Sequence, residues 1–161
     1  MRIGHLTNGI SCEYQMQDRL KEWLKSKNLV FIDELRIGQI KRIPDFLIFK
    51  PGKGLINTEA KCNAFECLLS QLDDNSAFCD YSFAFITDIC MTPQWFKEKL
   101  LRSGYGLIVY NREEKIITEV LEAHRNKNIN RDLKKVVTSR IEKELIMRKK
   151  ALQVDTQQKL L

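Results

Sequence analysis

The segment RIPDFLIFKPGKGLINTEAK, residues 42–61, decides how this chain folds. Residues 43–49 are rich in strand-forming side chains, and they stop at the sequence PGKG, residues 51–54, which is a strong turn signal. Residues 55–61 are again apolar and β-branched enough to form the returning strand. The segment therefore predicts a β-hairpin of two adjacent antiparallel strands.

Three ionisable residues fall at one end of this predicted hairpin. Asp45 lies near the start of the first strand, and Glu59 and Lys61 lie near the end of the second. Because side chains alternate across a strand, Glu59 and Lys61 are expected to project from the same face. The turn brings the start of one strand beside the end of the other, so Asp45 is expected to meet them there.

These residue types suit one kind of chemistry. Two carboxylates a few ångströms apart repel each other unless a cation sits between them or one is protonated. Ligand sets made only of oxygen favour a hard divalent cation such as Mg²⁺. Lys61 can orient or deprotonate an attacking water, or stabilise the charge that builds on phosphorus. The pattern suits metal-assisted hydrolysis of a phosphodiester, although alternating charges on a strand also mark an ordinary solvated face.

The flanking sequence predicts helices and strands in alternation. Apolar residues at helical spacing predict a helix over residues 11–27, with Ser11 as its N-cap, and a short strand follows from Leu29 to Ile32. After the hairpin, the pattern predicts a helix, a strand, a short helix opened by Pro93, a strand and a weaker strand, over residues 63–76, 81–87, 93–104, 105–110 and 115–121. Trp23, Trp95 and Phe96 are expected in the core. This order predicts an α/β domain with a central mixed sheet flanked by helices.

With the sequence PD at residues 44–45 and EAK at residues 59–61 on neighbouring strands, the chain resembles the PD-(D/E)XK nuclease superfamily. The resemblance spans residues 11–110. It implies a restriction-endonuclease-like core with the element order αβββαβ. The stretch CDYSFAF, residues 79–85, is similar to members of the DNA-repair type, and Holliday-junction resolvases and restriction enzymes share the same core.

The resemblance also implies roles for particular residues. Asp45 and Glu59 would bind Mg²⁺, for which Mn²⁺ substitutes, with help from the backbone carbonyl of Ala60, and Lys61 would assist the nucleophilic water. Many relatives carry a further metal-binding Glu on the first helix, and Glu13 is the natural match. The alternative for Glu13 is that it complements the helix dipole near its N-cap. Some relatives carry a Gln or Lys on the helix after the EAK segment, a place that Gln71 can fill.

The function implied is that of a metal-dependent nuclease hydrolysing phosphodiester bonds in DNA, in repair, recombination or restriction. The alternative is a non-catalytic subunit that uses the same fold to bind nucleic acid or another protein. A complete set of Asp45, Glu59 and Lys61 favours the enzyme, because a decayed site is expected to lose one of them.

Positive charge is concentrated at the C-terminal end. Residues 1–124 hold 16 Lys and Arg against 17 Asp and Glu, whereas residues 125–161 hold 11 against 4. This predicts a core domain over residues 1–124 and a basic helical extension over residues 125–161, a charge pattern that favours a polyanion such as DNA. Its apolar residues can pack on the domain or on a second copy in a homodimer. The residues expected to contact nucleic acid are Lys41, Arg42, Gln71, Lys134, Lys135 and Arg140.

Composition excludes several other classes of protein. The chain has 161 residues, 43% of them hydrophobic, and no apolar run long enough to span a membrane or to serve as a secretory signal. The five cysteines include no CxxC pair, which argues against a zinc ribbon or a disulfide framework and favours reduced thiols in the cytoplasm. With two histidines and no GxxxxGK[ST] or GxGxxG, a triad hydrolase or a nucleotide cofactor is not expected.

Overall fold

A computed structural model describes residues 4–87 and 92–160. The chain alternates helices and strands as follows: α1 Gly4–Ser26, β1 Val30–Asp33, β2 Phe46–Lys50, β3 Gly54–Ala60, α2 Phe65–Ser76, β4 Tyr81–Thr87, α3 Gln94–Ser103, β5 Gly106–Asn111, β6 Ile116–Leu121 and α4 Arg131–Lys159. The first six of these elements have the predicted order αβββαβ. Within the described residues, no helix is long and apolar enough to cross a membrane.

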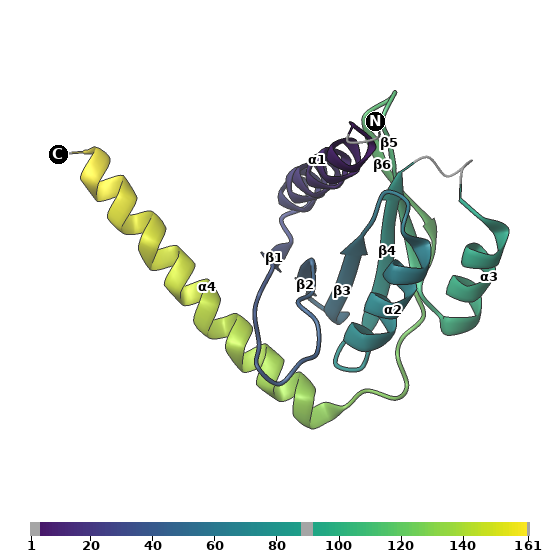
Figure 1. Ribbon diagram of the computed structural model, residues 1–161. Coiled ribbons are helices and arrows are strands. Elements are labelled where there is room, and N and C mark those ends of the chain that lie inside the picture. Colours follow the sequence, from purple (N-terminus) through teal and green to yellow (C-terminus); the bar gives the residue numbers. More distant parts are fainter. Residues whose placement is uncertain (1–3, 88–91, 161) are drawn as a thin grey trace.

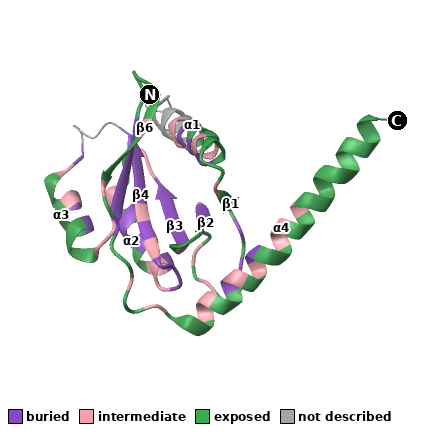
Figure 2. Cartoon of the chain, turned by 180° about the vertical axis from the view of Figure 1, so that it is seen from behind, coloured by how far each residue is buried: buried purple, intermediate pink, exposed green. Residues whose placement is uncertain are grey.

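The strands form one mixed sheet in the order β1-β2-β3-β4-β5-β6 (Figure 1). Strand β1 is antiparallel to β2, and the tight hairpin at residues 51–54 makes β2 antiparallel to β3. Strands β3, β4 and β5 are parallel, with helices α2 and α3 as the crossovers between them. Strand β6 returns antiparallel to β5. The central strand β3 is buried along almost its whole length, as a strand covered on both faces should be (Figure 2).

Side-chain alternation divides the core into two layers. On one face of the sheet, α1 packs its apolar stripe against alternate residues of the central strands: Met16, Leu20 and Leu24 of α1 with Phe46, Ile56, Ala60, Phe85 and Ile108. On the other face, α2 and α3 cover Ala84, Ile86, Leu107 and Val109. The start of α4 covers Leu47 and Leu55 on that second face. The end of β3 therefore lies where α1 and α2 approach the sheet from opposite sides.

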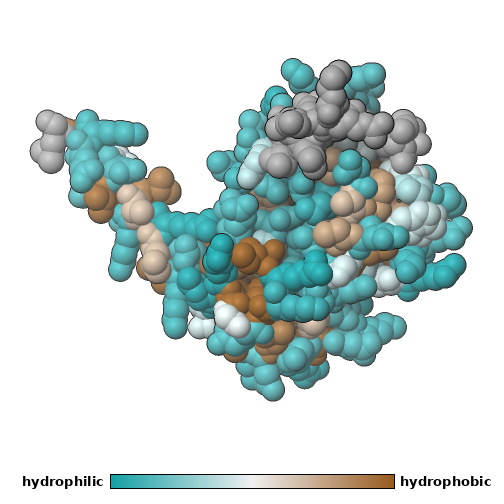
Figure 3. All heavy atoms as spheres, viewed as in Figure 1, coloured by the Kyte–Doolittle hydropathy of each residue, from teal (hydrophilic) through white to brown (hydrophobic). Residues whose placement is uncertain are grey.

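Helix α4 contacts the domain through residues up to Arg148. Val137 and Ile141 are buried against the sheet, and beside Ile141 and Leu145 a hollow of about 180 Å³ is lined by apolar side chains of the sheet edge (Figure 3). Arg148 still reaches Asp33 of β1 at 2.8 Å, but beyond it the helix stands away from the domain and its side chains are exposed (Figures 1 and 2). The predicted boundary at residue 124 falls before α4, whose first half shares the core of the domain.

A buried ion pair fixes the start of α4. Asp80, which is 1% exposed, accepts hydrogen bonds from the backbone N–H of Leu55 and from Nζ of Lys134, at 2.9 and 2.7 Å. Burial raises the pKa of Asp80, but the Lys134 and Leu55 hydrogen bonds outweigh it, so the pKa is lowered overall. Gly54 has a φ of +100°, and a Cβ there would collide with the Asp80 carboxylate. Glycine at the end of the turn therefore makes room for this pair.

We expect the substitution Lys134→Met to destabilise the protein by about 2–4 kcal/mol, because it leaves a buried carboxylate without its closest positive charge. The measurement is urea unfolding followed by circular dichroism. The matched control is Lys135→Met on the next position of α4, where the side chain is exposed and has no ion pair among the described residues. Equal stability of the two variants would contradict this account of Asp80.

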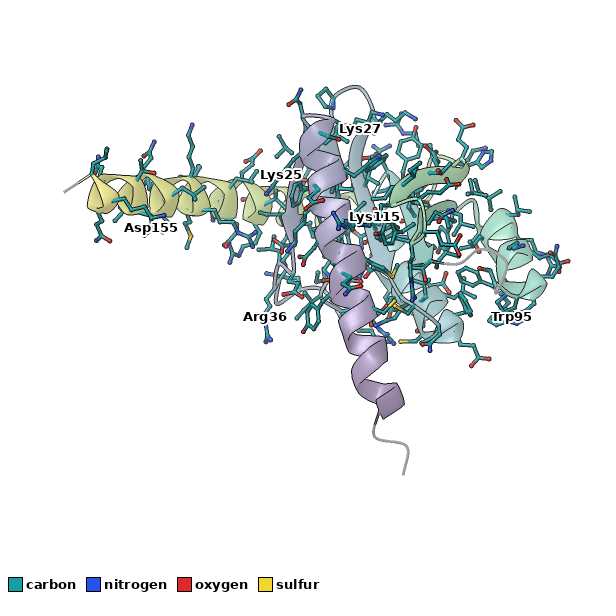
Figure 4. The ribbon with its side chains drawn as sticks, turned by 90° about the horizontal axis from the view of Figure 1, so that it is seen from above. Lys25, Lys27, Arg36, Trp95, Lys115 and Asp155 are labelled. Atoms are coloured by element: carbon teal, nitrogen blue, oxygen red, sulfur yellow. The ribbon has the colours of Figure 1, made fainter. Side chains whose placement is uncertain are left out.

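Three expectations from the sequence are corrected by the structure. The first helix begins at Gly4, so Ser11 lies inside it and is not its N-cap. The first strand of the hairpin begins at Phe46, because the backbone at residues 43–45 has not yet joined the sheet ladder. Trp95 is 42% exposed and lies on the outer side of α3, although its neighbour Phe96 is buried (Figure 4). The Trp95 ring is left outside because the helix has one apolar face only, which Phe96 and Leu100 occupy.

Candidate functional site

The hairpin register brings the two predicted carboxylates together. Phe46 is paired with Thr58, so Asp45, one residue earlier, lies beside Glu59, one residue later. The turn at residues 51–54 sets this register, with Lys50 paired to Gly54. Glu59 is on the face that α2 covers, and it is fully buried. Asp45 is half-buried at the entrance to the strand.

The two carboxylates are held by a reciprocal set of hydrogen bonds. The backbone N–H of Asp45 donates to Oε2 of Glu59 at 3.2 Å, and the backbone N–H of Ala60 donates to Oδ2 of Asp45 at 2.8 Å. Asn75 of α2 donates from Nδ2 to Oε1 of Glu59 at 2.6 Å. The positions of both carboxylates are therefore fixed by the backbone of the hairpin and by one side chain of α2.

Both carboxylates are harder to ionise than in water. Burial, followed by the nearby charge of Asp45, raises the pKa of Glu59 to about 8. Burial also raises the pKa of Asp45, and the hydrogen bond from Ala60 and the charge of Lys61 offset only part of this effect. Ionising both carboxylates together is therefore unfavourable in the metal-free protein, and a bound cation would relieve their repulsion.

Lys61 follows the last residue of β3 and reaches toward α1. Its Nζ lies 2.7 Å from Oε1 of Glu13, and both side chains are about a quarter exposed, at 22% and 26%. Burial lowers the pKa of Lys61, but the hydrogen bond and charge of Glu13, with the charge of Asp45, raise it above its ordinary value overall. Lys61 is thus an ammonium group at neutral pH, which favours an orienting or charge-stabilising role over that of a base.

Glu13 lies in the interior of α1, since the helix begins at Gly4 and has no acidic residue in its first turn. The interpretation that Glu13 complements the helix dipole therefore has no geometric basis, because that effect is confined to the first turn. Instead Glu13 contacts Lys61 at the edge of the site. Glu59 and Lys61 were predicted to project from the same face, but they do not. Because β3 ends at Ala60, Glu59 contacts α2 whereas Lys61 contacts α1.

The donor set fits a hard divalent cation. Asp45 and Glu59 present oxygen atoms only, and Mg²⁺ commonly binds proteins through one or two carboxylates while keeping several waters. Over residues 4–87 and 92–160, no group of three or more His, Cys, Asp and Glu side chains is placed to hold a metal ion. The site is thus an open pair of carboxylates rather than a structural metal site.

Asn75 is a site residue that the sequence analysis did not single out. It is 1% exposed, and α2 buries it together with Leu68, Leu69 and Leu72 on one face. A polar residue on the apolar stripe of a helix is the signal that marks it, because a buried amide requires a partner. Its Oδ1 has no hydrogen-bond partner within the described part of the chain.

The predicted nucleic-acid contacts near the hairpin are engaged with α2. Nε of Arg42 lies 2.7 Å from Asp74, and its Nη2 donates to Ser70 at 3.1 Å. Nζ of Lys41 lies 3.8 Å from the same Asp74 with a side chain that is 75% exposed. Gln71, on the same helix, has a buried Oε1 without a hydrogen-bond partner among the described residues. Lys41 and Arg42 are thus paired with Asp74 of α2 rather than with the carboxylate pair.

The predicted contacts on α4 lie near the other end of β3. Lys134 is paired with the buried Asp80, and Arg140 is paired with Glu144 at 3.0 Å. Lys135 is exposed and borders two hollows, of about 610 and 490 Å³. Further basic side chains line these hollows: Arg125, Lys127, Arg131, Arg36, Arg140 and Lys143. We call this set, with Lys134 and Lys135, the α4 basic surface.

Cys62 lies next to Lys61, but it is not an activated nucleophile. Burial and the neighbouring Cys12 thiol raise the pKa of Cys62 to about 12. A thiol with so high a pKa is neutral at physiological pH, whereas a catalytic cysteine needs a lowered pKa. The chemistry of this site therefore belongs to the carboxylates and to Lys61.

The strand order and the helices on both faces define a restriction-endonuclease-like α/β core with a basic C-terminal helix. No protein-family model matches the chain, and no curated protein sequence matches it. Two solved structures are similar. The SPO1766 protein of unknown function from Silicibacter pomeroyi has a TM-score of 0.58 and 18% identity, over 81% of this chain and 83% of that one. An XisH family protein from Nostoc punctiforme PCC 73102 has a TM-score of 0.52 and 12% identity, over 66% of this chain and 98% of that one. At these identities the likeness concerns the fold.

Proposed function

We propose that this protein is a divalent-metal-dependent nuclease of the PD-(D/E)XK type that hydrolyses phosphodiester bonds in DNA. The observation that carries the proposal is the meeting of Asp45, Glu59, Lys61 and Glu13 at the end of β3. Two adjacent carboxyl groups that resist ionising together, beside a protonated lysine, match what a phosphodiester and its metal require.

In this proposal Asp45 and Glu59 hold Mg²⁺ or Mn²⁺, with the backbone carbonyl of Ala60 as a further ligand. Bound there, the cation supplies positive charge to offset the charge that develops on the phosphate. Asn75 keeps the Glu59 carboxylate in a fixed orientation through its hydrogen bond to Oε1. The backbone N–H of Ala60 does the same for Asp45. Preorganised ligands of this kind lower the cost of reaching the reactive geometry.

Lys61 acts as an ammonium group in this scheme. Its raised pKa keeps the proton on Nζ, so it can donate hydrogen bonds to the attacking water or to a phosphate oxygen. Glu13 accepts a hydrogen bond from Nζ of Lys61 and so fixes the direction of the Lys61 side chain. Glu13 also remains a candidate further ligand of the cation, in exchange for its contact with Lys61.

DNA as the partner is supported by the α4 basic surface. Lys134 is required by Asp80, so the free positive charge comes mainly from exposed side chains such as Arg131 and Lys135. The surface lies beside the first residues of β3, whereas the carboxylates lie at its end, five to six residues away. At about 3.3 Å per residue this is a separation of roughly 17–20 Å, which is within one turn of a DNA duplex.

We expect the double variant Arg131→Ala, Lys135→Ala to bind duplex DNA more weakly and with less salt dependence. Each lost phosphate contact reduces the slope of log K against log salt by about 0.9, so a change of about 2 is expected. The measurement is fluorescence anisotropy with EDTA present, which prevents cleavage. The matched control is Lys97→Ala, Lys99→Ala on α3, which covers β4 and β5 of the same face, whereas α4 packs against β2 and β3. An unchanged slope in the α4 variant would remove this surface from the DNA interface.

The test of the proposed activity is a cleavage assay with Mg²⁺ and with Mn²⁺. The substrates are supercoiled plasmid, linear duplex, single strand, flap and four-way junction, with EDTA as the blank. Metal-dependent cutting of one substrate class supports the proposal and identifies whether the enzyme belongs with repair, recombination or restriction nucleases. If DNA binding is tight and salt-sensitive but no substrate is cut, the fold serves as a non-catalytic binding subunit.

A further inference from the structure

The side chains of Cys12, on α1, and Cys62, the residue that follows Lys61, lie side by side. Cys12 comes from α1, and Cys62 comes from the connection between β3 and α2. A side-chain hydrogen bond joins the two thiols. Sγ of Cys62 also lies 3.5 Å from Sδ of Met16, one helical turn after Cys12 on the same face of α1. Cys62 therefore points at the α1 face that carries Cys12.

We propose that Cys12 and Cys62 form an oxidisable dithiol, a redox modification site whose disulfide ties α1 to the end of β3. Both thiols are half-buried, so a small oxidant can reach them. Nη2 of Arg112 donates to Sγ of Cys12 at 2.6 Å, which makes the surroundings of this sulfur electropositive. Oxidisable cysteines occur in partly exposed, electropositive surroundings of this kind. The proposal is independent of the proposed nuclease activity.

The reaction balances with hydrogen peroxide as the oxidant. The sulfur of Cys12 attacks one peroxide oxygen, the O–O bond breaks, and Cys12 becomes a sulfenic acid as water leaves. The sulfur of Cys62 then attacks the sulfur of Cys12, the S–O bond breaks, and a second water leaves with the Cys62 proton. Two electrons pass from the two sulfurs to the peroxide, and one S–S bond forms. A dithiol reductant reverses the change by thiol–disulfide exchange.

The neighbours of the two cysteines give the bond its structural consequence. Glu13 follows Cys12 and Lys61 precedes Cys62, and these two residues form the ion pair at the edge of the carboxylate site. The disulfide closes a loop of about 50 residues across the same two elements. We therefore expect the oxidised protein to unfold at a temperature at least about 5 °C higher than the reduced protein.

The test oxidises the full-length reduced protein with one equivalent of hydrogen peroxide and blocks the remaining thiols with N-ethylmaleimide. Digestion with trypsin and glutamyl endopeptidase separates Cys62, on the peptide of residues 62–66, from Cys67, on the next peptide. Mass spectrometry should find residues 62–66 joined to residues 3–13, which contain Cys12. Calorimetry should show the rise in melting temperature, and dithiothreitol should abolish it.

Three variants make the test specific. Cys62→Ser and Cys12→Ser should each lose both the linked peptide and the rise in melting temperature. Cys67→Ser should keep both, because Cys67 is exposed and does not contact Cys12 in the structure. The proposal would be overturned if Cys62 were linked to another cysteine, or if both thiols stayed free after peroxide treatment. It would also be overturned if the oxidised and the reduced wild type had the same melting temperature.

Discussion

Replacing Lys61 by methionine is expected to reduce metal-dependent DNA cleavage by about 10³-fold while leaving metal binding intact. Methionine is similar in length but has no charge, so it removes the group that orients the water or stabilises charge on the phosphate. Losing one such preorganised donor typically costs 10²–10³-fold in rate, and the charge of Lys61 adds to the loss. Lys61 is also a partner of Glu13, but that pair is only partly buried, and its loss costs little stability.

The measurement is single-turnover cleavage of the substrate found in the wild-type assay, at saturating Mn²⁺. The matched control is Lys25→Met on the exposed face of α1, which should cleave at the wild-type rate. If Lys61→Met and the wild type cleave alike, Lys61 has no part in the reaction. If the variant loses metal binding as well, its role is to position the carboxylates.

The second large effect concerns Glu59. Its pKa in the folded protein, about 8, lies above the ordinary value of 4.5. Below the ordinary value the group is neutral in the folded and the unfolded state, so its contribution to stability is fully present. As the pH rises toward 8, the unfolded chain releases this proton and the folded chain retains it, so stability is lost progressively. The loss for the metal-free protein is on the order of 3 kcal/mol between pH 5 and pH 8.

The variant Glu59→Gln should lack this pH dependence, because the glutamine side chain does not ionise. It should be somewhat less stable at low pH, since its amide nitrogen cannot accept the hydrogen bond from Asp45 N–H. The measurement is the free energy of unfolding in urea, in EDTA, across this pH range. The control is Glu66→Gln on the exposed side of α2, which should follow the wild type. Parallel pH profiles for Glu59→Gln and the wild type would contradict the raised pKa.

Much of the site could be predicted because its two carboxylates are close in sequence. The turn at residues 51–54 fixes the hairpin register, and the register places Asp45 beside Glu59. The spacing of Asp45 and Glu59 around the turn was therefore sufficient to predict that the two carboxylates meet. The hydrophobic pattern likewise indicated the strand at Tyr81–Thr87, which the structure reproduces residue for residue.

The remaining contacts depend on tertiary packing that no local pattern describes. Lys134 pairs with Asp80 across 54 positions of the chain, and Lys61 pairs with Glu13 across 48. In isolation, each of these residues has the sequence signature of an ordinary surface charge. Asn75 was not predicted as a site residue for a related reason. Its role arises because α2 packs over Glu59, and a single asparagine in a helix does not reveal which side chain it faces.

The α4 helix illustrates a different limit. Its net positive charge was evident in the sequence, but the sequence did not show which lysines pair with buried groups and which remain exposed. Lys134 neutralises a buried carboxylate, whereas Lys135, one position later, is exposed beside the hollows of the α4 basic surface. Because adjacent residues on a helix point about 100° apart, neighbouring lysines can serve stability and binding separately.

The most direct test of the central claim, that Asp45 and Glu59 form a divalent-cation site, is a calorimetric titration of Mn²⁺ into the wild type and into Asp45→Asn. The titration is made near pH 8, where ionisation of Glu59 is no longer limiting. We predict that the wild type binds Mn²⁺ with a dissociation constant of millimolar or below and that Asp45→Asn shows no binding in this range. Equal binding by the two proteins, or no binding by the wild type, would contradict the claim.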